Sequence, residues 1–257
     1  MSSASSELIE NLAHVRGRID LAAARAGRRK EEITLIAVTK THSAKKILEL
    51  YEAGVRHFGE NRVQERESKL TQVAGIAAIW HMIGHVQKNK AARAVSLFDS
   101  VDSVDSAALA EKLQPARIDL ATQETANIND GKTKEEPAAP SSGKLLRVLI
   151  EVKLDPEPAK SGVDGKDLPR VVEAITRMPH LDLRGLMGVP PYFDNPEDAR
   201  PYFRHLRELR DAMRVQLGPE RLPVLSMGMS HDLEIAIEEG ATEVRVGTAL
   251  FGERDRA

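Results

Sequence analysis

Short apolar runs alternate with amphipathic segments along most of the chain. Eight of these runs have the length and the β-branched content of buried strands. They are residues 33–40, 57–60, 79–84, 97–103, 145–153, 181–189, 223–228 and 243–248. Helix-forming sequence separates them, as in "SAKKILELYEAG" and "ARPYFRHLRELRDAMRVQLG". This alternation predicts parallel strands that are joined by helical crossovers.

The number of strand–helix units favours a closed barrel. Eight units within 257 residues fit a (β/α)₈ TIM barrel. An open doubly wound sheet is the alternative, but it normally needs fewer strands, and no G-x-G-x-x-G motif follows the first run. Residues 6–27 have helical spacing of leucine, isoleucine and valine and predict an extra N-terminal helix. We therefore predict an α/β protein with a single barrel domain over residues 1–257.

Residues 122–144 interrupt the alternation. The stretch "TQETANINDGKTKEEPAAPSSGK" is polar, contains glycine, proline and serine, and has little periodicity. Such a composition offers little apolar surface to bury. We predict a flexible surface insertion between the fourth helix and the fifth strand, and its composition indicates no function of its own.

The composition narrows the classes of function. The chain has no cysteine, which excludes disulfides, a thiolate nucleophile and thiolate metal sites. A net charge of −2 gives no reason to expect nucleic acid or an anionic membrane as a partner. The N-terminus lacks an apolar core of signal-peptide length, and no stretch is apolar enough to span a membrane. We therefore predict a cytoplasmic protein.

Lys40 ends the first apolar run, "ITLIAVTK", at the barrel face that usually carries active sites. An ammonium group is costly to desolvate, so its place needs an explanation. In one interpretation its stem covers the core while its head reaches water. In the other, it is a partly desolvated amine with a lowered pKa that forms a Schiff base with an aldehyde.

The last two strands end in sequences that suit an anion. "GMS" precedes the helical "HDLEIAIEEG", which predicts Ser230 as an N-cap and Gly240 as the end of that helix. "GTALFG" places Gly247 and Thr248 at the start of another short helix. Unpaired N–H groups at helix starts bind phosphate oxygens, and this barrel position often holds phosphate. An aldehyde that also carries a phosphate, such as pyridoxal 5′-phosphate, would use both this site and Lys40.

Two further residues allow a structural and a functional interpretation. Arg245 lies two residues before Gly247, so its side chain points to the same side of its strand. It is either a salt-bridged barrel arginine or a cation that faces a pyridine nitrogen and weakens the ring as an electron sink. His81 is either a hydrogen-bonded core histidine or a ring that flanks a flat ligand. No pair of histidines at i, i+4 with a third ligand suggests zinc.

Seven motifs, spread along nearly the whole chain outside residues 122–144, resemble a known family. They are "AVTK", "HFGENRVQE", "WHMIGHVQKNK", "EVKLDPEPAKSGV", "LRGLMGVPPYF", "LSMGMSHDLEIAIEEG" and "VRVGTALFGER". In this order they are similar to the pyridoxal phosphate homeostasis protein family, whose barrels are related to the N-terminal domain of alanine racemase. The resemblance implies a non-catalytic protein that binds pyridoxal 5′-phosphate, buffers it and delivers it, with transient contact with the enzymes that use it left open.

The resemblance also implies roles for individual residues. Lys40 matches the lysine that holds the cofactor as a Schiff base, and Arg245 matches the arginine that faces the pyridine nitrogen. The implied phosphate contacts are Ser230, Gly247 and Thr248, and the implied ring contacts are Asn61 and His81. Lys160 matches a lysine near the site without an assigned role. The chain departs from the family at Arg62, where tyrosine is common, and at His231, where an acidic residue is common.

Two enzymatic alternatives stay open. A racemase needs a base on each face of the substrate Cα, and in alanine racemases a tyrosine from a second domain supplies one of them. We expect that domain to be absent, which also predicts a monomer. Tyr192 is the one tyrosine expected on a loop at the active face, where it is equally an ordinary loop anchor. A Schiff-base aldolase acting on a sugar phosphate would use Lys40 and the phosphate site equally well.

Overall fold

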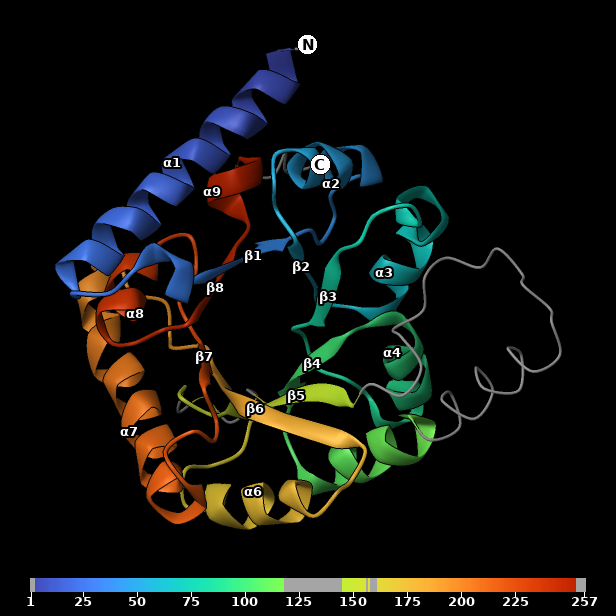
Figure 1. Ribbon diagram of the computed structural model, residues 1–257, viewed down its shortest axis with the longest axis vertical. Helices are drawn as coiled ribbons and strands as arrows, with labels where there is room; N and C mark the ends of the chain where they lie inside the picture. The colour runs from blue at the N-terminus through green and yellow to red at the C-terminus, as the bar shows by residue number, and fades with distance from the viewer. Residues whose placement is uncertain (1–2, 118–144, 156, 158–160, 253–257) are drawn as a thin grey trace, which may run out of the picture.

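Eight parallel strands form a closed barrel in the order in which they occur along the chain (Figure 1). The computed structural model describes residues 3–117, 145–155, 157 and 161–252. The strands are β1 (Thr34–Val38), β2 (His57–Glu60), β3 (Ile79–Met82), β4 (Ser100–Val104), β5 (Leu146–Val152), β6 (Leu181–Gly188), β7 (Val224–Ser226) and β8 (Glu243–Val246). Each strand overlaps one of the predicted runs, so the prediction of a TIM barrel is confirmed.

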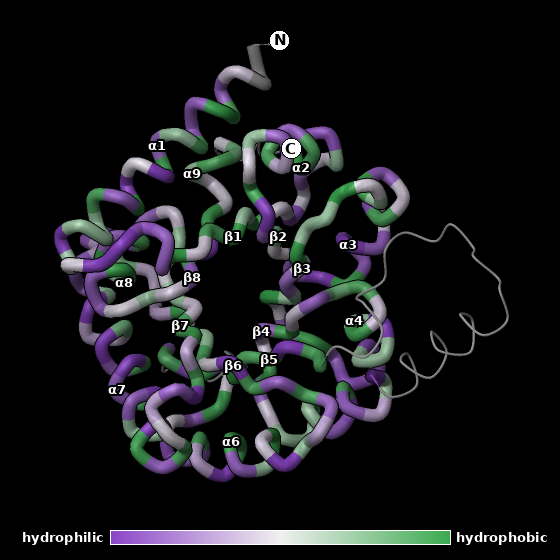
Figure 2. Tube along the Cα trace, in the orientation of Figure 1, coloured by the Kyte–Doolittle hydropathy of each residue, from purple (hydrophilic) through white to green (hydrophobic). Residues whose placement is uncertain are grey.

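Helices surround the barrel on its outside (Figure 1). They are α1 (Ser3–Arg25), α2 (Ala44–Glu52), α3 (Val63–Lys69), α4 (Ala91–Leu97), a helix at 107–117, α6 (Leu168–Thr176), α7 (Arg200–Leu217), α8 (Leu233–Glu238) and α9 (Thr248–Phe251). Strand residues such as Phe58 and Leu186 are fully buried in an apolar core that they share with the helices. Figure 2 shows the complementary pattern, with hydrophilic residues along outer helices such as α7.

The predicted N-terminal helix is confirmed as α1, which lies against α8 and α9 (Figure 1). Its buried apolar residues are Leu8, Leu12, Val15, Ile19, Ala22 and Ala23. The Asn11 amide donates to the carbonyl oxygen of Leu250 in α9 at 3.1 Å. Arg18 forms an ion pair with Glu234 of α8 at 2.6 Å. The extra helix is therefore fixed against the helices on both sides of β8.

Two predictions lie outside the described residues. The predicted insertion at 122–144 falls within residues 118–144, and Lys160 falls within residues 158–160. Both stay predictions. Within the described part of the chain, no helix combines the length and the apolar character of a membrane span.

Candidate functional site

Lys40 lies just beyond the C-terminal end of β1. The strand ends at Val38, and Lys40 follows two residues later with a half-buried side chain. The next residue, Thr41, has a φ of 67°, a left-handed conformation that is uncommon for a residue with a Cβ. The chain turns sharply here. Lys40 therefore lies at the barrel end where the strand C-termini gather, as predicted from the sequence.

Ser230 joins the loops that follow β7 and β8. Its Oγ accepts hydrogen bonds from the backbone N–H groups of Gly247 at 3.3 Å and Ala249 at 3.1 Å. Gly247 is the N-cap of α9 and Thr248 is its first residue, as the sequence predicts. Ser230 and Gly247 are half-buried, and Thr248 is exposed. The three residues expected to hold a phosphate therefore lie together at one edge of the barrel.

The prediction that Ser230 is the N-cap of the next helix is wrong. α8 begins at Leu233, and its N-cap is Asp232. The Asp232 Oδ1 accepts a hydrogen bond from the N–H of Met229 at 2.6 Å, so this carboxylate closes the turn instead. The Ser230 hydroxyl is directed across to the β8 loop. The predicted end of the helix is confirmed, because Gly240 follows it with a φ of 101°.

The Lys40 segment and the β8 loop are neighbours. β1 pairs in parallel with β8, so their C-terminal ends meet at one end of the barrel. A Cβ added at Gly247 would lie 3.5 Å from the Cβ of Val38. The ring of His42 stacks on the ring of Phe251 in α9, with centroids 4.0 Å apart. The loop that carries the amine and the loop that carries the predicted phosphate contacts are thus packed together.

Arg245 lies inside the barrel in β8, two residues before Gly247. Its side chain is buried, with an exposed fraction of 4%. The Nη1 donates to the Ser226 hydroxyl at 2.8 Å, and the Nη2 donates to the carbonyl oxygen of Gly188 at 3.0 Å. Burial lowers the pKa of Arg245, and the charge of Asp102 is the largest opposing influence. An arginine stays protonated in proteins, so a buried cation lies under the mouth of the barrel.

His81 belongs to a polar network in the barrel interior. It is fully buried, its Nε2 lies 3.0 Å from the Nδ1 of His57, and its Nδ1 lies 2.8 Å from the Oδ2 of Asp102. Burial would lower the pKa of His81, but the charge and hydrogen bond of Asp102 raise it above the usual value. Burial lowers the pKa of His57 to about 4. This geometry favours the core histidine over the ring-flanking contact.

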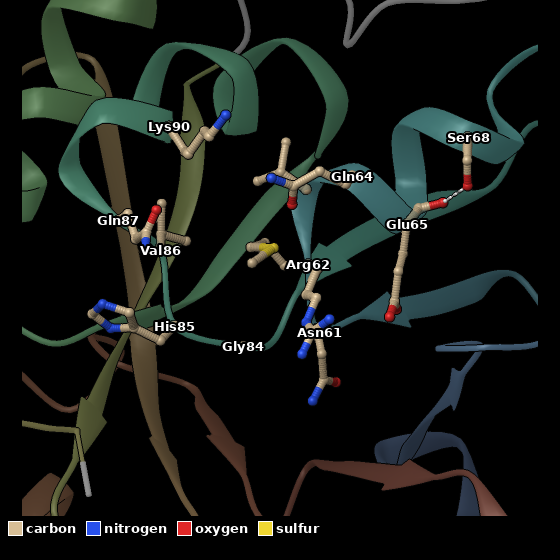
Figure 3. A pocket seen from close by; sticks show the side chains of 12 residues that line it. Asn61, Arg62, Gln64, Glu65, Ser68, Gly84, His85, Val86, Gln87 and Lys90 are labelled. Carbon is tan, nitrogen blue, oxygen red and sulfur yellow. Dashed lines mark hydrogen bonds between the residues drawn. The ribbon is translucent and has the colours of Figure 1, made fainter. Parts of the chain in front are cut away.

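Asn61 borders a cavity between the loops that follow β2 and β3. The cavity has a volume of about 680 Å³. Figure 3 shows Asn61 and Arg62 on the β2 side and His85 and Gln87 on the β3 side. A Cβ at Gly84 would overlap the carbonyl oxygen of Asn61, so only glycine lets the two loops approach this closely. Asn61 therefore lies just after β2 and forms part of the wall of this cavity.

One buried cluster beside Lys40 has no counterpart in the sequence-based predictions. The Glu60 carboxylate contacts the side chains of Thr39 and Lys69. Glu60 gives a signal in the sequence, because a carboxylate ends the apolar run "HFGE". Its cationic partner lies nine residues further on, in α3, and only the rotation of that helix brings the two together.

This chain is similar to known proteins over nearly its whole length. The family model for the alanine racemase N-terminal domain matches residues 11–255. Proteins named "Pyridoxal phosphate homeostasis protein" from Aquifex aeolicus and Pseudomonas aeruginosa are each 40% identical to this chain. The matches cover 95% and 97% of this chain, respectively, and 97% of each relative. The chain belongs to the pyridoxal phosphate homeostasis protein family.

Solved structures support the same membership. PipY of Synechococcus elongatus PCC7942, solved with pyridoxal phosphate bound, is 35% identical, with a TM-score of 0.77. The match covers 95% of this chain and all of PipY. Alanine racemase of Clostridium difficile 630 matches with a TM-score of 0.69 at 14% identity, over 97% of this chain and 57% of the racemase. The racemase likeness shows a common fold alone.

Arg62 and His231, the two residues at which the sequence departs from the family, are both exposed. Arg62 is the N-cap residue of α3 and lines the cavity beside Asn61. The Nε2 of His231 lies 3.1 Å from the carbonyl oxygen of Phe193, and its ring stacks on Tyr192. Neither departure alters the contacts of Ser230, Arg245 or the β8 loop.

Proposed function

We propose that this chain binds pyridoxal 5′-phosphate reversibly, as a Schiff base on Lys40, and acts as a carrier and buffer of this aldehyde without a reaction of its own. One observation carries the proposal: a half-buried lysine follows β1 in a segment that packs, through His42 and Phe251, beside the loops joined by Ser230, in a chain of this family. A relative of 35% identity has been solved with the same molecule bound.

The proposed contacts follow from the positions of the side chains. The Lys40 amine is the nucleophile for an aldehyde. The Ser230 oxygen already accepts two N–H groups, so its own O–H remains to donate to a phosphate oxygen. Gly247 and Thr248 lie at the same edge, at the start of α9, where an anion is favoured. The Gly247 N–H is bonded to Ser230, so the backbone N–H that we propose for the phosphate is that of Thr248. Asn61 borders the mouth on the β2 side. His81 is left out because its ring is fully buried.

The buried cation at Arg245 restricts the chemistry that a bound cofactor could support. When bound, pyridoxal phosphate supplies an aldehyde and a ring whose power as an electron sink depends on protonation of its nitrogen. A guanidinium near that nitrogen disfavours the proton. A racemase also needs a second base. Tyr192, the candidate for this base, is 77% exposed and stacks on His231, so the structure does not hold it as a base over a ligand.

A visible absorption spectrum of the purified protein tests the proposal. We expect a yellow protein, or a colourless one that turns yellow on addition of pyridoxal 5′-phosphate, and a band that borohydride abolishes. Peptide mapping should place the reduced adduct on Lys40. Lys40→Ala should lose the band. Lys45→Ala is its matched control and should keep the band, because the Lys45 side chain is 76% exposed on α2.

Two results would contradict the carrier. Racemisation of alanine or serine at an enzyme-like rate would make the protein a racemase. A protein that gains no band with pyridoxal 5′-phosphate, yet cleaves a sugar phosphate, would make it a Schiff-base aldolase.

A further inference from the structure

The residue before Lys40 is held by a buried ionic cluster formed by Thr39, Glu60 and Lys69. Thr39 and Glu60 are fully buried, and Lys69 is 8% exposed. The Thr39 hydroxyl donates to the Glu60 Oε1 at 2.7 Å, and the Lys69 Nζ donates to the same oxygen at 2.7 Å. One carboxylate oxygen thus receives two donors. A charge buried in this way is costly to leave unpaired, so the three groups depend on one another.

The cluster also holds the main chain. The Lys69 Nζ donates to the carbonyl oxygen of Thr39 at 2.8 Å, and the N–H of Thr39 donates to the carbonyl oxygen of Gly59 at 2.9 Å. Side chain, N–H and carbonyl of Thr39 are therefore all fixed. Lys40 and Thr41 follow directly, and Thr41 has the uncommon positive φ of 67°. Such a conformation persists only where its surroundings determine it.

The ionisation of Glu60 is balanced between opposing neighbours. Burial raises the pKa of Glu60 to about 7, Lys69 and Thr39 act against this shift, and Glu65 adds to it. The Oε2 atoms of Glu60 and Glu65 are both buried, and neither accepts a hydrogen bond from the described residues. Burial lowers the pKa of the nearby Arg66 guanidinium to about 10, and the charges of Asp99 and then Glu60 act against this shift. Glu65 lines the cavity beside Asn61.

We propose that Thr39, Glu60 and Lys69 are positioning residues that orient Lys40 for condensation with an aldehyde at the barrel mouth, in which the C=N bond replaces the C=O bond and the oxygen leaves as water. They act through the main chain of Thr39 and touch no ligand. The inference rests on the proposed Schiff base at Lys40. The phosphate contacts come from the loops after β7 and β8, which the cluster does not contact through any of the hydrogen bonds described above.

This separation distinguishes a positioning role from general destabilisation, because the two should affect covalent and phosphate binding differently. Loss of the cluster should weaken the covalent component of binding and leave the phosphate component. Pyridoxine 5′-phosphate has an alcohol where pyridoxal 5′-phosphate has the aldehyde, so it reports the phosphate and ring contacts alone. A structural defect would weaken both ligands together.

The experiment compares Thr39→Val with Thr39→Ser. Valine has nearly the shape of threonine but no hydroxyl, whereas serine keeps the hydroxyl that donates to Glu60. Affinities for both ligands are measured by titration, and the reducible band is measured by absorption. For Thr39→Val we expect roughly tenfold weaker binding of pyridoxal 5′-phosphate and a change of less than about twofold for pyridoxine 5′-phosphate, a tenfold change being about 1.4 kcal/mol. Thr39→Ser should restore most of the loss.

Lys69→Met provides a second variant, and Lys45→Met is its exposed control. Lys69→Met should weaken pyridoxal 5′-phosphate binding at least as much as Thr39→Val does. Equal losses for the two ligands, or unchanged pyridoxal 5′-phosphate binding in both variants, would overturn the positioning role. If Lys69→Met does not fold by circular dichroism, the Thr39 pair decides alone. A wild-type protein without a reducible band would instead refute the proposed Schiff base, so the two failures are distinguishable.

Discussion

Asp102→Asn tests the polar interior of the barrel most directly. Asp102 and His81 are both fully buried, their Oδ2 and Nδ1 atoms are 2.8 Å apart, and the Ser100 hydroxyl donates to the other carboxylate oxygen. Burial opposes ionisation of Asp102, but the charge and hydrogen bond of His81 hold its pKa below the usual range. The substitution removes the charge while keeping the size of the side chain.

The expected loss of stability is large for a single substitution. Removal of one partner of a buried ion pair typically costs about 3–5 kcal/mol, because the other charge is left uncompensated. Asparagine keeps one oxygen, which can accept from His81, and its amide N–H can donate to the Ser100 hydroxyl at the other position. We therefore expect the lower end of the range, about 3 kcal/mol of unfolding free energy.

The pH dependence has a defined sign. The pKa of His81 is raised above 6.5 in the folded protein, so its stabilisation is fully present below pH 6.5 and is lost as the pH rises through the folded pKa. The pKa of Asp102 is lowered from 3.8, so its stabilisation is present above pH 3.8 and is lost as the pH falls through the folded pKa. Above pH 6.5 the advantage of wild type over Asp102→Asn should shrink, by at most about 1.4 kcal/mol per pH unit.

Urea unfolding followed by Trp80 fluorescence provides the assay, because Trp80 is the single tryptophan and is 4% exposed. Asp20→Asn is the control, since Asp20 makes an exposed ion pair with Lys30 and should cost less than about 1 kcal/mol. The reasoning is refuted if Asp102→Asn costs no more than Asp20→Asn. It is also refuted if the advantage of wild type stays constant as the pH rises above 6.5.

Two further substitutions separate binding from packing. Lys40→Ala should abolish the reducible band and lower the affinity for pyridoxal 5′-phosphate to that for pyridoxine 5′-phosphate, because the phosphate contacts remain; an unchanged spectrum on titration would contradict this. Gly84→Ala should destabilise the protein by about 1–3 kcal/mol or more in thermal unfolding, because the new methyl group overlaps the Asn61 backbone. Gly17→Ala, in α1 with no atom within 4 Å of the new Cβ, should stabilise it by up to about 1 kcal/mol, and equal effects of the two glycine variants would argue against the overlap.

The barrel could be predicted because every strand overlaps a short run with buried apolar residues, and helical sequence separates each run from the next. The ends of the strands are less accessible to such patterns. The fourth run was predicted from residue 97, but β4 begins at Ser100, because Leu97 ends α4 and Phe98 is its C-cap. Both residues are buried, and an apolar pair does not distinguish the end of a buried helix from the start of a strand.

The candidate site could be predicted where chain order alone brings residues together. Parallel strands place all their C-terminal ends at one edge, so Lys40 and the β8 loop had to be near each other once a barrel was assumed. Side-chain direction is a different matter. Ser230 and Asp232 are both residue types that favour an N-cap. Asp232 takes this position in the structure, where its carboxylate accepts a hydrogen bond from the N–H of Met229. The Glu60–Lys69 contact depends on which face α3 turns to the barrel, which a seven-residue helix does not reveal by its period.

The charges inside the barrel explain how Arg245 can remain a cation that faces the mouth. Its described hydrogen bonds go to neutral oxygens, those of Ser226 and Gly188. Its attraction to carboxylates acts without such bonds, through the nearby charges of Asp102 and Glu151. A guanidinium bonded directly to a carboxylate would have part of its charge cancelled at the site. Here the carboxylates favour the charged form while the donors of the guanidinium remain oriented by neutral partners. The proposed contact of Arg245 with a pyridine nitrogen requires a cation of this kind.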